Sequence, residues 1–220
     1  MSAVWAQGHA TTSTIHAAAA VAPAMVSAAH STDALSPEAR ALVKWAVVSG
    51  DPGGRPFAVI DKREARIHVF SGAGQLIDSA WVLLGSARGD DTAPGIGAKK
   101  IADILPEERT TPAGRFVTVP GRNASGHPVI WVDYDAAVSM HVVVNHVKSE
   151  RRLDRLVSPD PAEHRVSYGC INLPPAFFSK VARPAFSAKG GIVYVLPETR
   201  RLAEVFPGIG ESDGASKQRH

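Results

Sequence analysis

The chain has 220 residues, of which 45% are apolar and 20% are charged, and its formal net charge is +3. This length allows one domain with a substantial core, with or without tails. Lysine and arginine are scattered, which argues against a nucleic-acid-binding protein. No apolar run approaches the roughly 18 residues that a membrane-spanning helix needs, so we expect no stable membrane span.

Residues 1–35 are rich in alanine, serine and threonine, and no lysine or arginine precedes Arg40. Residues 17–29 resemble the apolar centre of a signal peptide, although a basic stretch before it is missing. The segment is therefore interpreted as low-complexity or export-related.

A helix is predicted to begin at Ser36, because serine is a favoured N-cap and Pro37 and Glu38 follow it. The helix should end by Gly50, and residues 51–54 should form a turn. We expect residues 36–56 to be an N-terminal helix and linker, 57–200 the main domain and 201–220 a flexible tail.

From Phe57 onward the pattern favours strands. Residues 57–61, 66–70 and 76–84 predict a three-stranded meander, followed by a Gly/Asp/Pro-rich loop over 85–97. A short helical piece is possible over 99–105. Further strands are predicted over 111–119, 128–132, 136–144 and 191–196, with one helix between about 174 and 186. The sum predicts a mostly β, α+β domain of sandwich or barrel type.

Cys170 is the only cysteine, so its thiol is unavailable for an internal disulfide. Gly169 permits a tight turn just before it, and the helix predicted from Pro174 would place the sulfur near a helix N-terminus. Such a position lowers a thiol pKa. The alternative is a buried, inert cysteine, the usual state of an isolated free thiol.

A thiol nucleophile requires a base. His141 is preferred because it lies at the end of a predicted strand, a rigid platform for a catalytic group. His146, five residues later in a predicted loop, remains an alternative. His164 precedes the cysteine by six residues and is expected to be solvated.

The run Ser167-Tyr168-Gly169-Cys170-Ile171-Asn172 resembles the Ser-His-Gly-Cys motif of the L,D-transpeptidase (YkuD-type) family of bacterial cell-wall enzymes. The segment 111–114, Thr-Pro-Ala-Gly, is similar to that family's Thr-Pro-x-Gly segment. The order of strands, histidine, cysteine, helix and final strand also matches. The resemblance covers residues 57–197 and implies an L,D-transpeptidase-like β-sandwich of mixed sheets, with one helix after the cysteine.

The resemblance implies that Cys170 is the acylated nucleophile and His141 its base. Ser167 and Gly169 would shape the nucleophile loop, with the N–H groups of Gly169 and Cys170 as oxyanion donors. Tyr168 and Asn172 would contact substrate. No metal or organic cofactor is implied.

This chain departs from the family at Tyr168, where the family has histidine, and at Val142, where it has glycine or serine. The distance in sequence from His141 to Cys170 also predicts an insertion over 148–165. Its arginines are candidates to bind substrate carboxylates, Arg151, Arg152 and Arg165 among them. The alternative is a solvated helical turn with local ion pairs.

The function expected from the resemblance is peptidoglycan L,D-transpeptidation. A thioester with a tetrapeptide stem would pass to an amine acceptor and cross-link the wall, and carbapenem-type inhibitors would acylate the same thiol. We expect a monomer exported to the periplasm or cell envelope. The alternatives are an L,D-carboxypeptidase, an enzyme anchoring proteins to the wall, and an inactive wall-binding module.

Two further classes are disfavoured. A papain-like hydrolase has its cysteine before its histidine, the reverse of the order here. A zinc site has little support, because a single cysteine and no tight His/Cys/acid spacing are present.

Overall fold

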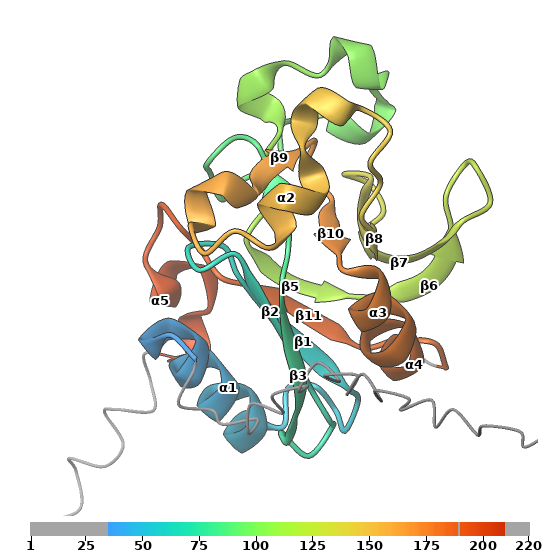
Figure 1. Cartoon of the computed structure of the whole chain (residues 1–220). Helices are drawn as coiled ribbons and strands as arrows, with labels where there is room; N and C mark the ends of the chain where they lie inside the picture. Colours follow the sequence, from blue (N-terminus) through green and yellow to red (C-terminus); the bar gives the residue numbers. More distant parts are fainter. Residues whose placement is uncertain (1–34, 189, 210–220) are drawn as a thin grey trace, which may run out of the picture.

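The computed structural model describes residues 35–188 and 190–209 (Figure 1). The low-complexity or export-related segment predicted over 1–35 lies outside them except for Leu35, as do residues 210–220 of the predicted tail. Within the described residues, no helix is long and apolar enough to cross a membrane.

The first sheet has five strands in the order β3-β2-β1-β11-β5. β1 pairs with β2 and β2 with β3 in antiparallel fashion, as the predicted meander requires, whereas β1 and β11 run parallel. The strands are β1 (Phe57–Asp61), β2 (Arg66–Phe70), β3 (Leu76–Trp81), β5 (Gly114–Val117) and β11 (Ile192–Val195).

The second sheet has four strands in the order β10-β8-β7-β6, and β8 and β10 run parallel. Its strands are β6 (Val119–Arg122), β7 (Pro128–Asp133), β8 (Val138–Val142) and β10 (Ile171–Leu173). A short parallel pair, β4 (Leu84–Gly85) and β9 (Arg165–Ser167), lies beside it. Both larger sheets are mixed, which confirms the predicted fold class.

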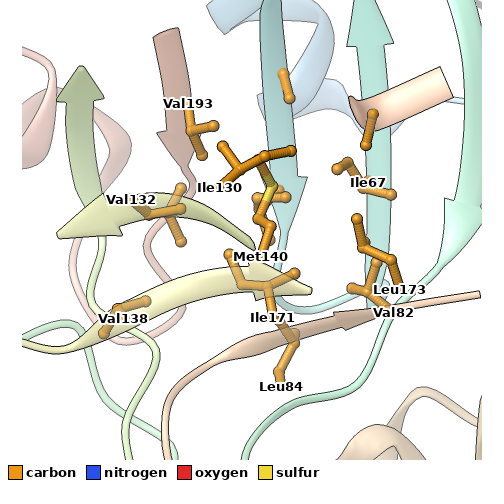
Figure 2. Close-up of a cluster of buried hydrophobic side chains, with 14 of the residues drawn as sticks. Ile67, Val82, Leu84, Ile130, Val132, Val138, Met140, Ile171, Leu173 and Val193 are labelled. Carbon is orange, nitrogen blue, oxygen red and sulfur yellow. The ribbon is translucent and has the colours of Figure 1, made fainter. Parts of the chain in front are cut away.

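The main core lies between the two larger sheets (Figure 2). Successive strand residues point to opposite faces, so Ile67 of β2 and Val193 of β11 face inward from the first sheet. Met140 of β8 and Ile171 of β10 face them from the second, and all four side chains are fully buried. The cysteine-bearing segment is thereby fixed at the margin of a packed core.

The outer face of the first sheet has its own apolar cluster. Helix α1 (Pro37–Ser49) packs there through Leu42, with Ser36 as the N-cap and Gly50 as the left-handed C-cap, as predicted. Helix α5 (Leu202–Val205), a 3-10 turn η8 (Pro207–Ile209) and buried Phe206 complete this cover. The stretch 201–209, predicted as a flexible tail, is therefore ordered by apolar burial.

The helix after the cysteine is continuous but irregular. It consists of α3 (Pro175–Phe177), a π-helical turn η7 (Phe178–Ala182) and α4 (Arg183–Phe186). The loop beyond β4 contains only 3-10 turns, η2 (Ile96–Ala98), η3 (Ile101–Asp103) and η4 (Pro106–Glu108). The predicted insertion contains η5 (Lys148–Glu150), α2 (Arg152–Leu156) and η6 (Pro161–His164).

Candidate active site

Cys170 ends a tight turn that connects β9 to β10. The Ser167 hydroxyl donates to the carbonyl oxygen of Cys170 (2.6 Å) and accepts the N–H of Gly169 (3.1 Å). Gly169 has a φ of 123°, and a Cβ there would lie 2.7 Å from the carbonyl oxygen of Thr110. The turn therefore requires glycine at this position, both for its backbone conformation and for space.

A second segment supports the turn from behind. The buried Thr111 hydroxyl donates to the carbonyl oxygen of Gly169 (2.9 Å) and accepts the N–H of Gly85 (2.9 Å). Thr111 opens the Thr-Pro-Ala-Gly segment, so the two motifs recognised in the sequence meet in space through this one hydroxyl. This contact gives the segment a physical role in holding the nucleophile turn.

His141 reaches the thiol because β8 and β10 pair in parallel with His141 opposite Asn172. Its Nδ1 lies 2.8 Å from the carbonyl oxygen of Val142. A carbonyl can only accept, so this contact assigns the proton of the neutral ring to Nδ1. Nε2 is then the free base, and the imidazole and the Cys170 thiol interact strongly enough to shift each other's pKa.

The thiol and the imidazole shift each other's pKa. Burial alone would raise the pKa of Cys170, but the hydrogen bond and charge of His141, with contacts from Ser139, lower it below the ordinary value. Burial alone would lower the pKa of His141, but Cys170 and the Val142 carbonyl raise it. The pair therefore favours a thiolate beside an imidazolium, the reactive form of a cysteine nucleophile.

The source of this activation differs from the one expected. The sequence suggested a helix N-terminus beside the sulfur, but β10 separates Cys170 from the helix that begins at Pro175. Three strand residues span roughly 10 Å, beyond the reach of a helix end, whose effect is confined to its first turn. The neighbours of the sulfur come instead from β8 and its approach, with the Ser139 hydroxyl at 3.7 Å and the Ala137 carbonyl oxygen at 3.6 Å.

Asn172 is fully buried and touches both members of the pair. Its Nδ2 lies 3.4 Å from Nε2 of His141 and 3.4 Å from the carbonyl oxygen of Cys170. Its Oδ1 accepts a hydrogen bond of 2.8 Å from Arg152 of α2, whose Nε is 2.6 Å from Glu150. The insertion thus contributes an arginine to the surroundings of the base.

The other two arginines predicted to bind substrate already have partners in the chain. Arg151 is exposed and pairs with Asp154 at 3.2 Å. Arg165 lies in β9, where it pairs with buried Glu198 at 2.5 Å and donates to the carbonyl oxygen of Lys62 at 2.8 Å. These contacts favour a structural role for Arg165.

Two further expectations need correction. His164 was expected to be solvated, but it is fully buried, with its ring stacked on Trp81 and its nitrogens 3.0 Å from the carbonyl oxygens of Val82 and Ser158. The N–H of Gly169 was expected to be an oxyanion donor, but it already donates to Ser167. The N–H of Cys170 remains the candidate donor from this turn.

Arg109 is a site residue that the sequence did not reveal. Its guanidinium lies over the ring of Tyr168 at 4.1 Å, and its Nη2 donates to the carbonyl oxygen of Ile104 (3.1 Å). Nε of Arg109 is buried without a partner. The one available signal was its position two residues before Thr111, in the segment that supports the nucleophile turn.

A pocket of about 330 Å³ is lined in part by His141. Exposed His146, the alternative base, also lines this pocket, whereas the groups that lower the thiol pKa are His141 and Ser139. The described residues hold no group of three or more metal-binding side chains. The pocket is lined by Asn123, His127, Pro128, His141, Val142, Val143, Val144, Asn145 and His146.

No family model matches the sequence, and no curated protein matches it. Solved structures that resemble it include the catalytic domain of the Enterococcus faecium L,D-transpeptidase, at 18% identity and a TM-score of 0.37, covering 65% of this chain and 98% of that one. An L,D-transpeptidase from Mycobacterium smegmatis has 17% identity and a TM-score of 0.36, covering 64% of this chain and 58% of that one.

A third similar structure is the K307A mutant of the helical cell shape determining protein Pgp2 from Campylobacter jejuni. It has 13% identity and a TM-score of 0.44, and the match covers 83% of this chain and 64% of that one. The chain thus spans less than two thirds of the second and third of these structures. At these identities and TM-scores, the function has to be inferred from the residues of this chain, whose motifs resemble the same L,D-transpeptidase family.

Proposed function

We propose that this protein is a cysteine acyltransferase of the L,D-transpeptidase kind, acting on peptide stems of the bacterial cell wall. The observation that carries the proposal is the Cys170–His141 pair, in which the thiol pKa is lowered and the imidazole pKa raised. An inert wall-binding module has no need of such a pair. The order of the Thr-Pro-x-Gly, histidine and Ser-x-Gly-Cys segments in the sequence supports the choice of family.

In the proposed reaction, the Cys170 thiolate attacks the carbonyl carbon at the L-centre of the diaminoacid in a tetrapeptide stem. The N–H of Cys170 is placed to donate to the oxyanion that forms. The tetrahedral intermediate collapses to a thioester, and the terminal D-alanine leaves as an amine that receives the proton from His141. An acceptor amine then attacks the thioester, His141 takes its proton, and the thiolate is restored.

A pocket and an arginine near Cys170 and His141 could accommodate a peptide substrate. The pocket beside His141 has the size of a small-ligand site and is mainly apolar in its lining. Arg109, stacked on Tyr168 two residues before Cys170, presents a guanidinium, which suits a carboxylate of the stem. We propose the pocket for the acyl donor or acceptor and Arg109 for a carboxylate. Export to the cell envelope, where such substrates occur, belongs to the same proposal.

Intact-mass spectrometry tests the proposal directly. The wild-type protein, incubated with a tetrapeptide muropeptide or a carbapenem, should gain one covalent adduct, and Cys170→Ala should gain none. Ser149→Ala, a change on the exposed surface of the insertion, is the matched control and should keep the adduct. A folded wild-type protein that forms no adduct with either reagent would contradict the proposal.

The acceptor is decided in the same experiment by analysing the products. With a second stem present, we expect a cross-linked dimer and free D-alanine. Free tripeptide and D-alanine as the only products, whether or not an amine is supplied, would identify a carboxypeptidase instead.

A further inference from the structure

The guanidinium of Arg152 is bound by two side chains of its own chain, Asn172 and Glu150. Its Nη1 donates to Oδ1 of Asn172 at 2.8 Å, its Nε to Glu150 at 2.6 Å, and its side chain is only 12% exposed. Arginine has five donors and no acceptor. The oxygen of the Asn172 amide must therefore face Arg152, which fixes the orientation of an otherwise ambiguous side chain.

The orientation of the Asn172 amide decides whether its oxygen or its nitrogen faces Nε2 of His141. With Oδ1 turned to Arg152, the donor Nδ2 lies 3.4 Å from Nε2 of His141. A donor is matched by a lone pair, so it favours the neutral ring, whose proton is on Nδ1 toward the carbonyl oxygen of Val142. Once Nε2 is protonated, two donors face each other, so this one contact opposes the imidazolium.

The charges around His141 act in opposite directions. The Cys170 thiolate favours the imidazolium, whereas the positive charge of Arg152 lowers the pKa of His141. Glu150 pairs with Arg152, and His127 and His146 line the pocket that His141 also lines. A base that must accept and return a proton works best when neither form is strongly preferred.

We infer that Arg152 is a positioning residue: by fixing the Asn172 amide, it presents a donor to Nε2 of His141 and limits how far the imidazolium is favoured over the neutral ring. The inference rests on the proposed function for its meaning. The observations behind it are independent of the proposed function, because they concern only the protonation of the His141 ring. It also gives the insertion a role that differs from substrate binding.

The test is an NMR titration of His141 in the full chain, which reports both the midpoint of the ring's titration and its neutral tautomer. In Arg152→Gln, which removes the charge, the midpoint should rise by about one pH unit, while the Nδ1–H tautomer should persist because the Val142 carbonyl still holds it. Arg152→Lys, which keeps the charge and a donor, should leave the midpoint near that of the wild type. An unchanged midpoint in folded Arg152→Gln would overturn the inference.

Arg155→Gln is the matched control for loosening of the insertion. Arg155 is also in α2 and donates to the carbonyl oxygens of Glu150 (2.9 Å) and Glu163 (2.8 Å). If Arg155→Gln raised the midpoint as much as Arg152→Gln, a general effect of the insertion would be responsible and the inference would fail. The titration needs no substrate. Inactivity of the wild type on stem peptides would therefore contradict the proposed function and leave the inference about Arg152 standing.

Discussion

The thiol of Cys170 is activated by one residue on a neighbouring strand. His141 reaches it because β8 and β10 run parallel in register, and its hydrogen bond and charge lower the thiol pKa against the effect of burial. Without the imidazole, burial would act unopposed. The reactivity of the sulfur should therefore depend on His141 more than on any other side chain.

Replacement of His141 should be visible in the pH dependence of thiol alkylation. The wild-type rate with iodoacetamide should reach half its maximum at a pH below the roughly 8.5 of an ordinary thiol. In His141→Gln, the midpoint should move above that value, because the stabilisation of the thiolate is lost and desolvation remains. Intact mass against time at each pH measures the rate.

His146→Gln serves as the control for this measurement, because His146 is exposed on the same pocket. It should leave the alkylation midpoint unchanged. A shift in His146→Gln equal to that in His141→Gln would remove His141 from the role of base and revive the alternative that the sequence left open.

Motifs predicted the pairing of His141 with Cys170 but none of the other long-range contacts of this site. The turn geometry of Ser167 and Gly169 follows from local sequence, and so does the choice of a histidine at a strand end. The stacking of Arg109 on Tyr168 joins segments about sixty residues apart, which no local pattern encodes. The burial of His164 depends in the same way on Trp81, on another strand.

At the scale of elements, the loop after β4 is fastened by a buried ionic cluster. Lys62 has no exposed surface; its Nζ lies 2.8 Å from Asp90 and donates to the carbonyl oxygen of Thr111 at 2.9 Å. Asp90 also accepts the N–H groups of Glu198, Thr199 and Arg200. One carboxylate thus connects the loop, the segment that supports the nucleophile turn and the chain after β11.

Loss of that carboxylate should cost stability. Asp90→Asn leaves the buried Lys62 without its nearest counter-charge, and breaking such a pair typically costs about 3–5 kcal/mol. Chemical denaturation at neutral pH measures this free energy. Asp91→Asn, at an exposed neighbouring carboxylate, should change it little. Equal losses in the two variants would contradict the role given to the cluster.

The pH dependence of the same comparison follows from the Asp90 pKa. Burial alone would raise that pKa, but the hydrogen bonds from Lys62, Thr199 and the backbone lower it well below the ordinary value. A carboxyl group with a depressed folded-state pKa contributes stability above its unfolded pKa, which is lost as the pH falls through the folded one. The difference between wild type and Asp90→Asn should therefore shrink as the solution is made acidic.

Elements with a strong local pattern were predicted at their observed positions. Residues 57–61 and 66–70 form β1 and β2 with the expected bounds, because short apolar runs lie between turn residues. β4 and β9 were missed, since two- and three-residue strands exist only through their pairing with each other. The helix expected over 99–105 is reduced to one 3-10 turn, η3, within that range.

On the scale of the whole molecule, the two apolar faces of the first sheet pack against different layers. The inner face packs against the sheet that carries His141, whereas the outer face is covered by α1 and by Phe206. Leu42 of α1 is fully buried there. Stability and chemistry are therefore separable by mutation.

Leu42→Ala should lower the free energy of unfolding by about 2–5 kcal/mol through the cavity it leaves. The rate of Cys170 alkylation in the folded protein should stay at the wild-type value. Val48→Ala, at an exposed position of the same helix, should change neither quantity appreciably. A large fall in alkylation rate for folded Leu42→Ala would show that the outer layer shapes the site.

The layer formed by α1 and Phe206 on the outer face of the first sheet also limits how far the domain can be truncated at its N-terminal side. A fragment that starts at Phe57, where the strand pattern begins, would lack α1 and leave Phe57, Val59 and Phe70 facing water beside Tyr194. A contiguous apolar sheet face of that kind promotes self-association. A fragment that keeps this cover therefore begins no later than Leu35, which is buried in the same cluster. The next residue is Ser36, whose hydroxyl caps α1 and donates to Asp61 at the end of β1.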